Sequence, residues 1–521
     1  MTQRAMTLGA TSPEAISLGT WIGFFSMAGG TFMAVLDTQI VASSLAEIGA
    51  SLGSTIDEAS WIQTAYIIAE VIMIPLAGWL SRSLSLKYLY VLACILFTLS
   101  SVCCALAWSI ESIMVFRIFQ GLFAGAMIPL LYQAIYALFP RERQANVTLF
   151  VVLIIAMAPT IGPTLGGWIT QTYSWRWLFL LNVLPGIIVS TSVFYLVKCP
   201  PPNLSLLKKF DYQGIILIAI FLGCLEYVLG EGTENDWFDS RLIVALSLIV
   251  VTSAGLLLWR ELTCRHPVID LRAFRDRNFA TGCLFNFIMG LGLFGSGYLM
   301  TVFLSSVRDY NSLEIGKVMM VPGLAMMISL PVVRLFRTRL GVRTTLAIGL
   351  ILFGVSLSIN AFMTAETGFD QLLLPQAMRG FAMMMCMSPI TELALGRLPT
   401  EAVANASSLY SLMRYLGGGI GIAVINTLVE MRSSLHHQRL VEVLNPARYP
   451  TSDIITSFSS SVAGQTTDLV QAQQGGLQLL SMLVGRESLL MTCNDIWLMI
   501  ACLFAISFML MPTVQKVAPR S

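Results

Sequence analysis

The 521-residue sequence has little charge, and that scarcity excludes several classes of protein. Only 12% of its residues are charged and 56% are hydrophobic, whereas an ordinary soluble domain is about 25% charged. A soluble core of this size cannot bury so much apolar surface, so a soluble enzyme is excluded, and the low polarity also excludes long disorder. The net charge of +2 is too small for the basic field of a nucleic-acid-binding protein. A polytopic membrane protein remains.

Metal-binding and catalytic patterns are also missing. The ten cysteines show no CxxC spacing and lie mostly in or beside apolar runs, as small core residues do. His436 and His437 are compatible with a metal site, but a polar turn is the more ordinary interpretation. The chain contains no GxxxxGK followed by Ser or Thr, no HExxH and no GxSxG, which disfavours an ATP-driven pump. We expect no bound metal, no cofactor and no catalytic residue.

Fourteen stretches are long and apolar enough to cross a bilayer, which takes about 20 residues. Backbone groups have no partners in lipid, so these stretches should be helices, and they lack the period-two alternation of a barrel. Their approximate cores are 20–45, 60–80, 88–108, 112–138, 147–170, 177–197, 212–230, 242–259, 279–304, 315–333, 344–363, 371–396, 403–429 and 493–512.

Lysine and arginine predict the orientation of these spans, because they favour cytoplasmic loops. With a cytoplasmic N-terminus, the inner side holds twenty of the 31 Lys and Arg residues, the outer side holds eight, and three lie inside spans. We therefore expect both termini in the cytoplasm and the long polar loop 431–492 in the periplasm.

An internal repeat is visible once spans 7 and 8 are set aside. Short basic loops at 82–87 and 334–343 follow the second and tenth spans, and RIFQG at 117–121 is matched by RG at 379–380. Two six-helix halves that rock about a central site are a common transporter plan. The predicted divisions are an N-terminal half at 1–198, a linker with two additional transmembrane helices at 199–265, and a C-terminal half at 266–521.

Ionisable residues inside spans are costly and mark candidate functional sites. Asp37 in span 1 and Arg117 in span 4 lie at similar depths and can pair, so protonation of Asp37 would break the pair and couple proton entry to a helix movement. A static structural pair is the alternative. Glu70 lies near the middle of span 2 and should be largely neutral. It is a candidate proton carrier or contact for a cationic substrate, and a hydrogen-bonded structural acid is the alternative.

Four further ionisable residues are secondary candidates for the substrate cavity. Glu226 lies towards the outer end of span 7, and Glu392 lies towards the inner end of span 12. Arg379 and Arg414 can hold an anionic substrate or orient the acids, and Arg414 can equally cap carbonyl groups where helices pack.

Span 5 contains a dense cluster of helix-breaking residues, APTIGPTLGG at 158–167. Within a membrane such residues permit a bend and close contact between helices, which suits a gate. The predicted gating residues are Pro159, Gly162, Pro163, Gly166 and Gly167. Methionine-rich stretches at 318–327 and 383–387 are typical either of core and lipid contacts or of an adaptable hydrophobic cavity.

These motifs carry a family resemblance over essentially the whole chain. RIFQG resembles the span-4 motif of the major facilitator superfamily, and 158–167 resembles its span-5 antiporter motif, with Ala158 at the first place. The segment LDTQIVASSLAEIG at 36–49 resembles the span-1 motif of the fourteen-helix drug:proton antiporter family. Segments 231–240 and 266–283 are similar to those of EmrB-like multidrug exporter permeases.

The resemblance implies an all-α polytopic membrane protein of the major facilitator fold, with fourteen transmembrane helices. It implies a proton-coupled antiporter of the bacterial inner membrane that exports hydrophobic or amphiphilic drugs. Asp37 and Arg117 would serve proton coupling, and the span-5 motif would serve antiport. It also implies two partners, a periplasmic adaptor of the membrane fusion type and a TolC-like outer-membrane channel. The loop 431–492 would contact the adaptor, with a short amphipathic helix at 477–485.

The loop after span 2 departs from the superfamily pattern, because Arg82 replaces its usual Asp, and Glu70 and Glu392 are unexpected acids for close EmrB relatives. Two other functions stay open. One is a dedicated exporter of a single natural product such as a siderophore. The other is a membrane receptor, which no appended signalling domain supports. The span-5 motif argues against a proton-coupled importer.

Overall fold

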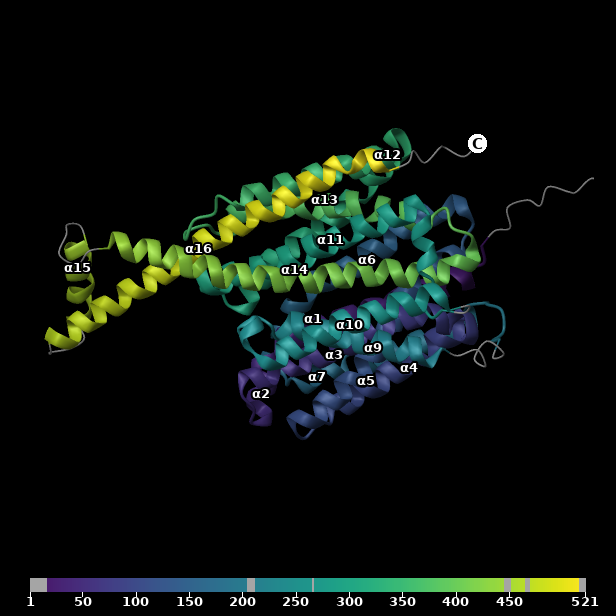
Figure 1. Ribbon diagram of the computed structural model, residues 1–521, viewed down its shortest axis with the longest axis horizontal. Helices are drawn as coiled ribbons and strands as arrows, with labels where there is room; N and C mark the ends of the chain where they lie inside the picture. Colours follow the sequence, from purple (N-terminus) through teal and green to yellow (C-terminus); the bar gives the residue numbers. More distant parts are fainter. Residues whose placement is uncertain (1–15, 204–210, 265–266, 445–450, 464–468, 515–521) are drawn as a thin grey trace, which may run out of the picture.

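The computed structural model describes residues 16–203, 211–264, 267–444, 451–463 and 469–514, and the regular structure in these ranges is helical. Helices satisfy every backbone group internally, as lipid requires. Figure 1 shows the long helices running side by side along one bundle. The chain termini, which we predicted to be cytoplasmic, and residues 204–210 of the predicted linker lie outside the described residues.

We call the helices before the linker the first group. They are α1 (Leu18–Ala42), α2 (Leu45–Leu52), α3 (Ile56–Leu84), α4 (Leu86–Ala105), α5 (Ile110–Leu138), α6 (Arg141–Thr172), α7 (Arg176–Leu180) and α8 (Val183–Leu196). Helices α3 and α4 pack on α5, and α1 packs on α6 and α8. Gly121 and Gly125 of α5 face the backbone carbonyls of Tyr66 and Glu70, so α3 and α5 meet backbone to backbone.

The helices after the linker form the second group. They are η3 (Leu271–Arg275), α11 (Arg277–Val302), η4 (Phe303–Val307), α12 (Ser312–Asn360), α13 (Phe369–Leu395), α14 (Thr400–Val443), α15 (Thr451–Ala463), α16 (Leu469–Met509) and η5 (Met511–Thr513). Gly341 divides α12 into two helices, because its φ of 83° and ψ of 167° are not helical. A positive φ costs glycine little.

Between the groups lie α9 (Tyr212–Glu231), η2 (Trp237–Asp239) and α10 (Arg241–Thr263). Helix α9 packs on α3 of the first group and α14 of the second, whereas α10 packs mainly on α9. Large apolar side chains of α10 are exposed, including Leu248, Val251 and Trp259. This exposure is what a lipid-facing helix requires.

Helix boundaries agree with the predicted spans. Twelve helices among the described residues are long and apolar enough to cross a membrane. One of the twelve is α12, whose two parts contain the predicted cores 315–333 and 344–363. Helix α13 is not among the twelve, and it covers the predicted core 371–396 to within one residue. The arrangement is consistent with fourteen crossings. The side of the membrane that each loop faces and the predicted domain boundaries stay predictions.

The segment 431–492 is helical where it is described, rather than an irregular loop. Its described residues continue α14 to Val443, form α15, and begin α16 at Leu469. We call these three pieces the projection, and Figure 1 shows them extending beyond one end of the bundle. Helix α14 has 44 residues, or roughly 66 Å at 1.5 Å per residue, about twice the thickness of the hydrocarbon core.

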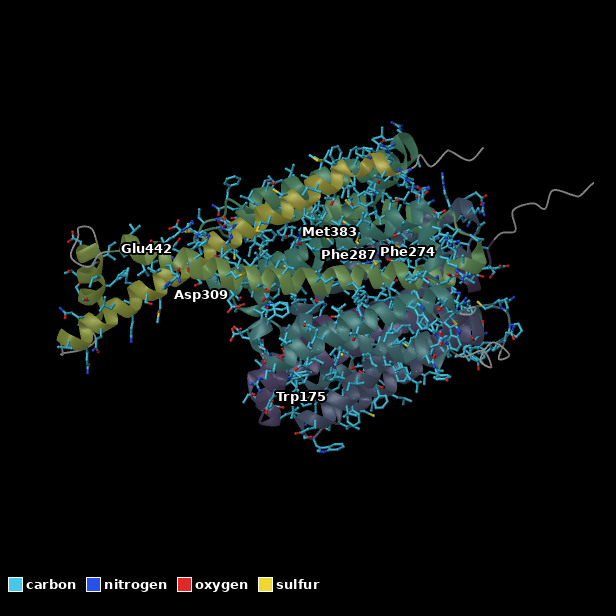
Figure 2. The ribbon with its side chains drawn as sticks, in the orientation of Figure 1. Trp175, Phe274, Phe287, Asp309, Met383 and Glu442 are labelled. Carbon is cyan, nitrogen blue, oxygen red and sulfur yellow. The ribbon has the colours of Figure 1, made fainter. Side chains whose placement is uncertain are left out.

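The predicted short helix at 477–485 is not separate, since it forms part of the 41-residue α16. Helix α15 packs on α16, where Gly476 fits against Ser459. Figure 2 shows Glu442 on the projection, well away from Met383 and Phe287 within the bundle.

We expect Gly121→Ala to lower stability by about 1–3 kcal/mol, because the added methyl would overlap the Tyr66 carbonyl in the α3–α5 contact. Gly255→Ala is the matched control, since its Cβ would meet nothing within 4 Å. Thermal unfolding of the purified variants in detergent measures both. Equal stability of the two variants would contradict the backbone contact.

Candidate functional site

Asp37 of α1 and Arg117 of α5 form an ion pair inside the bundle. Arg117 Nη1 donates to Asp37 Oδ2 over 2.5 Å, and neither side chain is exposed. Arg117 Nε donates to the Ile62 carbonyl at 3.3 Å, and its guanidinium lies 4.0 Å from the centroid of the Tyr66 ring. The predicted pairing is confirmed, whereas the proton-coupling role stays a prediction.

Two amide side chains complete the surroundings of Asp37, and sequence reasoning missed both. Gln120 Nε2 donates to Asp37 Oδ1 at 3.1 Å, and Asn182 Nδ2 donates to the same oxygen at 2.6 Å. Gln120 also accepts from Arg117 Nη1 at 2.8 Å. The spacing could have predicted the role of Gln120, because a residue three positions after Arg117 lies on the same face of the helix. Asn182 interrupts an apolar run between α7 and α8.

Two consecutive residues of α14 join the second group to the first. Tyr415 Oη donates to Glu70 Oε1 of α3 at 3.0 Å. Arg414 Nη2 donates to Tyr132 Oη of α5 at 2.8 Å, and the guanidinium lies 5.5 Å from the Tyr132 ring centroid. The structure therefore places Glu70 and Arg414 at the contact between the groups, where each has a tyrosine partner.

A small central cavity of about 30 Å³ lies between the two groups. It has room for roughly one water molecule. The lining side chains come from α1, α5, α6, α11, α13 and α14, and are mostly apolar: Val35, Ile128, Ile155, Ala156, Pro159, Leu293, Phe294, Met387, Arg414 and Tyr415.

Helices of the two groups meet at both ends of this cavity. Towards the projection, Gly316 and Gly323 of α12 lie against Thr164 and Thr160 of α6. Towards the opposite end of the bundle, Gly78 of α3 lies against α14 near Ser408. The two groups are therefore in close contact on both sides of the cavity along the bundle.

The glycine and proline motif of span 5 lies on α6, which stays helical through Pro159 and Pro163. Gly162 faces Gln39, and Gly166 faces Ile40 and Ser43, at the end of α1 close to Asp37. Pro159 lines the central cavity, and Gly167 is partly exposed. The predicted close helix contact is therefore present, and it links the helix that carries Asp37 to the wall of the cavity.

The remaining candidates lie apart from the ion pair and the cavity lining. Glu392 accepts from Arg337 at 3.2 Å and keeps a 28% exposed side chain. Glu226 is buried beside Gly419 of α14, and its Oε1 has no partner among the described residues. Arg379 of α13 is buried and donates to Ser296 Oγ at 3.3 Å.

His436 lies on α14 rather than in a turn, and its Nε2 is 2.9 Å from Asp495 Oδ2 of α16. Each methionine-rich stretch contributes a side chain to the lining of a cavity or groove. Met387 lines the central cavity, and Met320 lines a groove of about 720 Å³ between α12 and α13.

Two helical groups that close around a central cavity, with ionisable residues at their contact, define a membrane transporter rather than an enzyme. The model of the Major Facilitator Superfamily matches residues 27–422. The chain therefore belongs to that superfamily, as a multi-pass protein of the bacterial inner membrane.

Relatives agree with this assignment. The chain is 36% identical to the colistin resistance protein EmrB of Acinetobacter baumannii over 94% of each chain. It is 30% identical to the multidrug export protein EmrB of Escherichia coli over 91% of each. Among solved structures, the proton:xylose symporter XylE shares the fold with a TM-score of 0.59 at 13% identity, over 97% of each chain.

A double-mutant cycle tests the bond between the groups. We expect Glu70→Gln and Tyr415→Phe to couple by about 0.6–1.7 kcal/mol in thermal unfolding, since the first replaces the carboxylate acceptor of this hydrogen bond by a weaker amide acceptor and the second removes its donor. The control cycle pairs Glu70→Gln with Tyr132→Phe, whose hydroxyl bonds Arg414 instead. A Glu70–Tyr415 coupling no larger than the control coupling would contradict the assigned contact.

Proposed function

We propose that this protein is a proton-coupled antiporter that exports hydrophobic or amphiphilic drugs and toxic compounds, with the proton gradient as its energy source and no other cofactor. The observation that carries the proposal is the Asp37–Arg117 pair, enclosed by amide donors beside the α1–α6 contact. The relatives named for multidrug export and colistin resistance support the drug class. They do not favour dedicated export of one natural product such as a siderophore.

Protonation of Asp37 is the proposed coupling step. A neutral Asp37 no longer compensates Arg117, and Gln120 and Asn182 lose their anionic acceptor. Removing one partner of a buried ion pair costs about 3–5 kcal/mol when the other charge stays buried. Such a cost is large enough to favour a different arrangement of α1 and α5, in which Arg117 finds another partner or water.

Helix α6 passes this movement to the cavity. Gly162 and Gly166 fix α6 against α1 within two turns of Asp37. The same helix carries Pro159 into the cavity wall and Thr160 and Thr164 into the contact with α12. A shift of α1 therefore acts on the contact that closes the cavity on the side of the projection.

Glu70 offers a second proton-sensitive link. Its side chain accepts the Tyr415 hydroxyl across the two groups, and the strength of this bond depends on whether Glu70 is ionised or neutral. Hydrogen bonds to an ionised acceptor are roughly twice as strong as neutral ones, so protonation of Glu70 weakens this link. Proton uptake at Glu70 then favours separation of the groups, in the same direction as at Asp37.

The projection is the proposed docking surface for a periplasmic adaptor, which would pass substrates to a TolC-like outer-membrane channel. Val443 and Met482 are 81% and 69% exposed, although their helices extend well beyond the thickness of a membrane. Exposed apolar side chains on a water-facing element favour burial against a partner.

We expect Asp37→Asn to abolish substrate flux driven by an imposed pH gradient in proteoliposomes, because the variant cannot exchange a proton at this position. Asp239→Asn, an exposed acid of η2, is the control and should keep full flux. Size-exclusion profiles verify folding of both. Full gradient-driven flux in Asp37→Asn would overturn the proposed coupling.

The docking surface makes a separate prediction. Val443→Ser combined with Met482→Ser should abolish co-purification of a co-expressed adaptor of the membrane fusion type, while flux in proteoliposomes stays unchanged. Gln473→Ser combined with Gln474→Ser, also exposed on the projection, is the matched control. An adaptor that still binds the apolar double variant would exclude these side chains from the contact.

A further inference from the structure

The second group repeats the ion-pair position of the first group without its acid. Asp37 and Ser296 each stand nineteen residues beyond the first residue of their helix, Leu18 of α1 and Arg277 of α11. Each accepts from the arginine of a neighbouring helix, Arg117 of α5 at 2.5 Å and Arg379 of α13 at 3.3 Å. A neutral hydroxyl thus replaces the carboxylate.

This replacement leaves Arg379 without a counter-charge. Its side chain is buried, with 4% of the residue exposed, and none of the ion pairs between described residues includes it. Its Nε has no hydrogen-bond partner within the described ranges. A buried charge inside a membrane protein is costly unless it is paired, and unpaired examples mark binding sites and ion pathways.

Arg414 is also buried, but it is better compensated. It bonds Tyr132 and lies within 5.6 Å of the centroids of the Tyr132 and Tyr410 rings. Tyrosine faces attract cations. Neither arginine forms an ion pair among the described residues, and the Nε of each has no partner there. Arg414 has two tyrosine partners, however, whereas the hydrogen bond found for Arg379 is the one to Ser296.

Gln376 places a side-chain amide beside Arg379. It precedes Arg379 by three residues on α13, so the two side chains share a helix face. It is fully buried, and neither its Oε1 nor its Nε2 has a partner in the part of the chain that the structure describes. In the first group an amide also lies one turn from the arginine, on its other side, since Gln120 follows Arg117 by three residues and donates to the carboxylate of Asp37.

A methionine path connects this place with the central cavity. Arg379, Met383 and Met387 follow one another at intervals of four residues, which puts them on one face of α13. Met387 lines the cavity, and the path from it to Arg379 is roughly 12 Å at 1.5 Å per residue. Methionine side chains adapt readily to irregular apolar ligands.

We propose that Arg379 and Gln376 bind the carboxylate of an anionic amphiphile, whose apolar tail lies along Met383 towards the cavity. A guanidinium and an amide both donate to carboxylate oxygens, and arginine can do so through two parallel bonds. The inference rests on the proposed export function and adds the charge of the substrate to it. The ligand replaces the counter-ion that the second group lacks.

The test compares two probes with the same tail, radiolabelled decanoate and radiolabelled decyltrimethylammonium. Binding to the purified protein in detergent gives Kd, and pH-driven flux in proteoliposomes gives KM. We expect Arg379→Gln to raise both constants for decanoate about tenfold or more, and to leave those for the cation within about twofold. Arg379→Lys should be intermediate, because it keeps the charge but not the planar pair of donors.

Two further variants secure the interpretation. Gln376→Leu keeps Arg379 and removes the amide, so it tests the site even if Arg379→Gln fails to fold, and it should weaken decanoate more than the cation. Arg339→Gln removes an exposed charge and should change neither probe. Equal effects of Arg379→Gln on both probes, or no effect on decanoate, would overturn the inference.

A different result would contradict the proposed export function, namely that the wild-type protein transports neither probe when the pH gradient is imposed. Decanoate binding in detergent still distinguishes the variants in that case. Failure of the site and failure of export are therefore separable.

Discussion

A carboxylate and a guanidinium that neutralise each other away from water are the interaction on which the rest of this structure depends. Asp37 and Arg117 have no exposed surface, so each is tolerated inside the bundle only because the other is present. The amides of Gln120 and Asn182 satisfy the carboxylate further. Glycines of α6 then bring a second helix onto α1 beside the pair. A change in the charge of Asp37 therefore affects contacts of α1 with both α5 and α6.

Each helical group buries an arginine that donates to a side chain of a neighbouring helix, but the acceptors differ in charge. The first group holds a neutralised pair, whereas the second holds a buried arginine next to a serine. Between them, Tyr415 and Arg414 of α14 make hydrogen bonds to Glu70 and Tyr132. This division suggests a division of labour in which the first group handles protons and the second handles substrate charge. The central cavity lies between the two groups, where both can act on it.

Hydropathy predicted where the long helices of the bundle lie, because lipid imposes the same requirement on each helix regardless of its neighbours. The Asp37–Arg117 pair was also predictable, since only a few charges lie in the spans and these two have similar depths. The roles of Gln120 and Asn182 were not, because neutral amides carry no charge that would reveal a partner on another helix. Similarly, the Arg379–Ser296 contact depends on how α13 packs on α11.

The structure of the projection could not be predicted from the sequence, for a different reason. Its polar composition indicated a position outside the membrane, but Ser, Gln and Thr occur in loops and on solvated helices alike. Helix α14 continues to Val443 and α16 begins at Leu469, and both α14 and α15 pack on α16.

Proton release on substrate binding is the most direct test of the central claim that Asp37 exchanges a proton during transport. A transported drug is added to the purified protein in weakly buffered detergent solution, and a pH-sensitive dye records the protons released. The account predicts release by the wild type and loss of that release in Asp37→Asn, with substrate binding retained. Equal release by both proteins would contradict it.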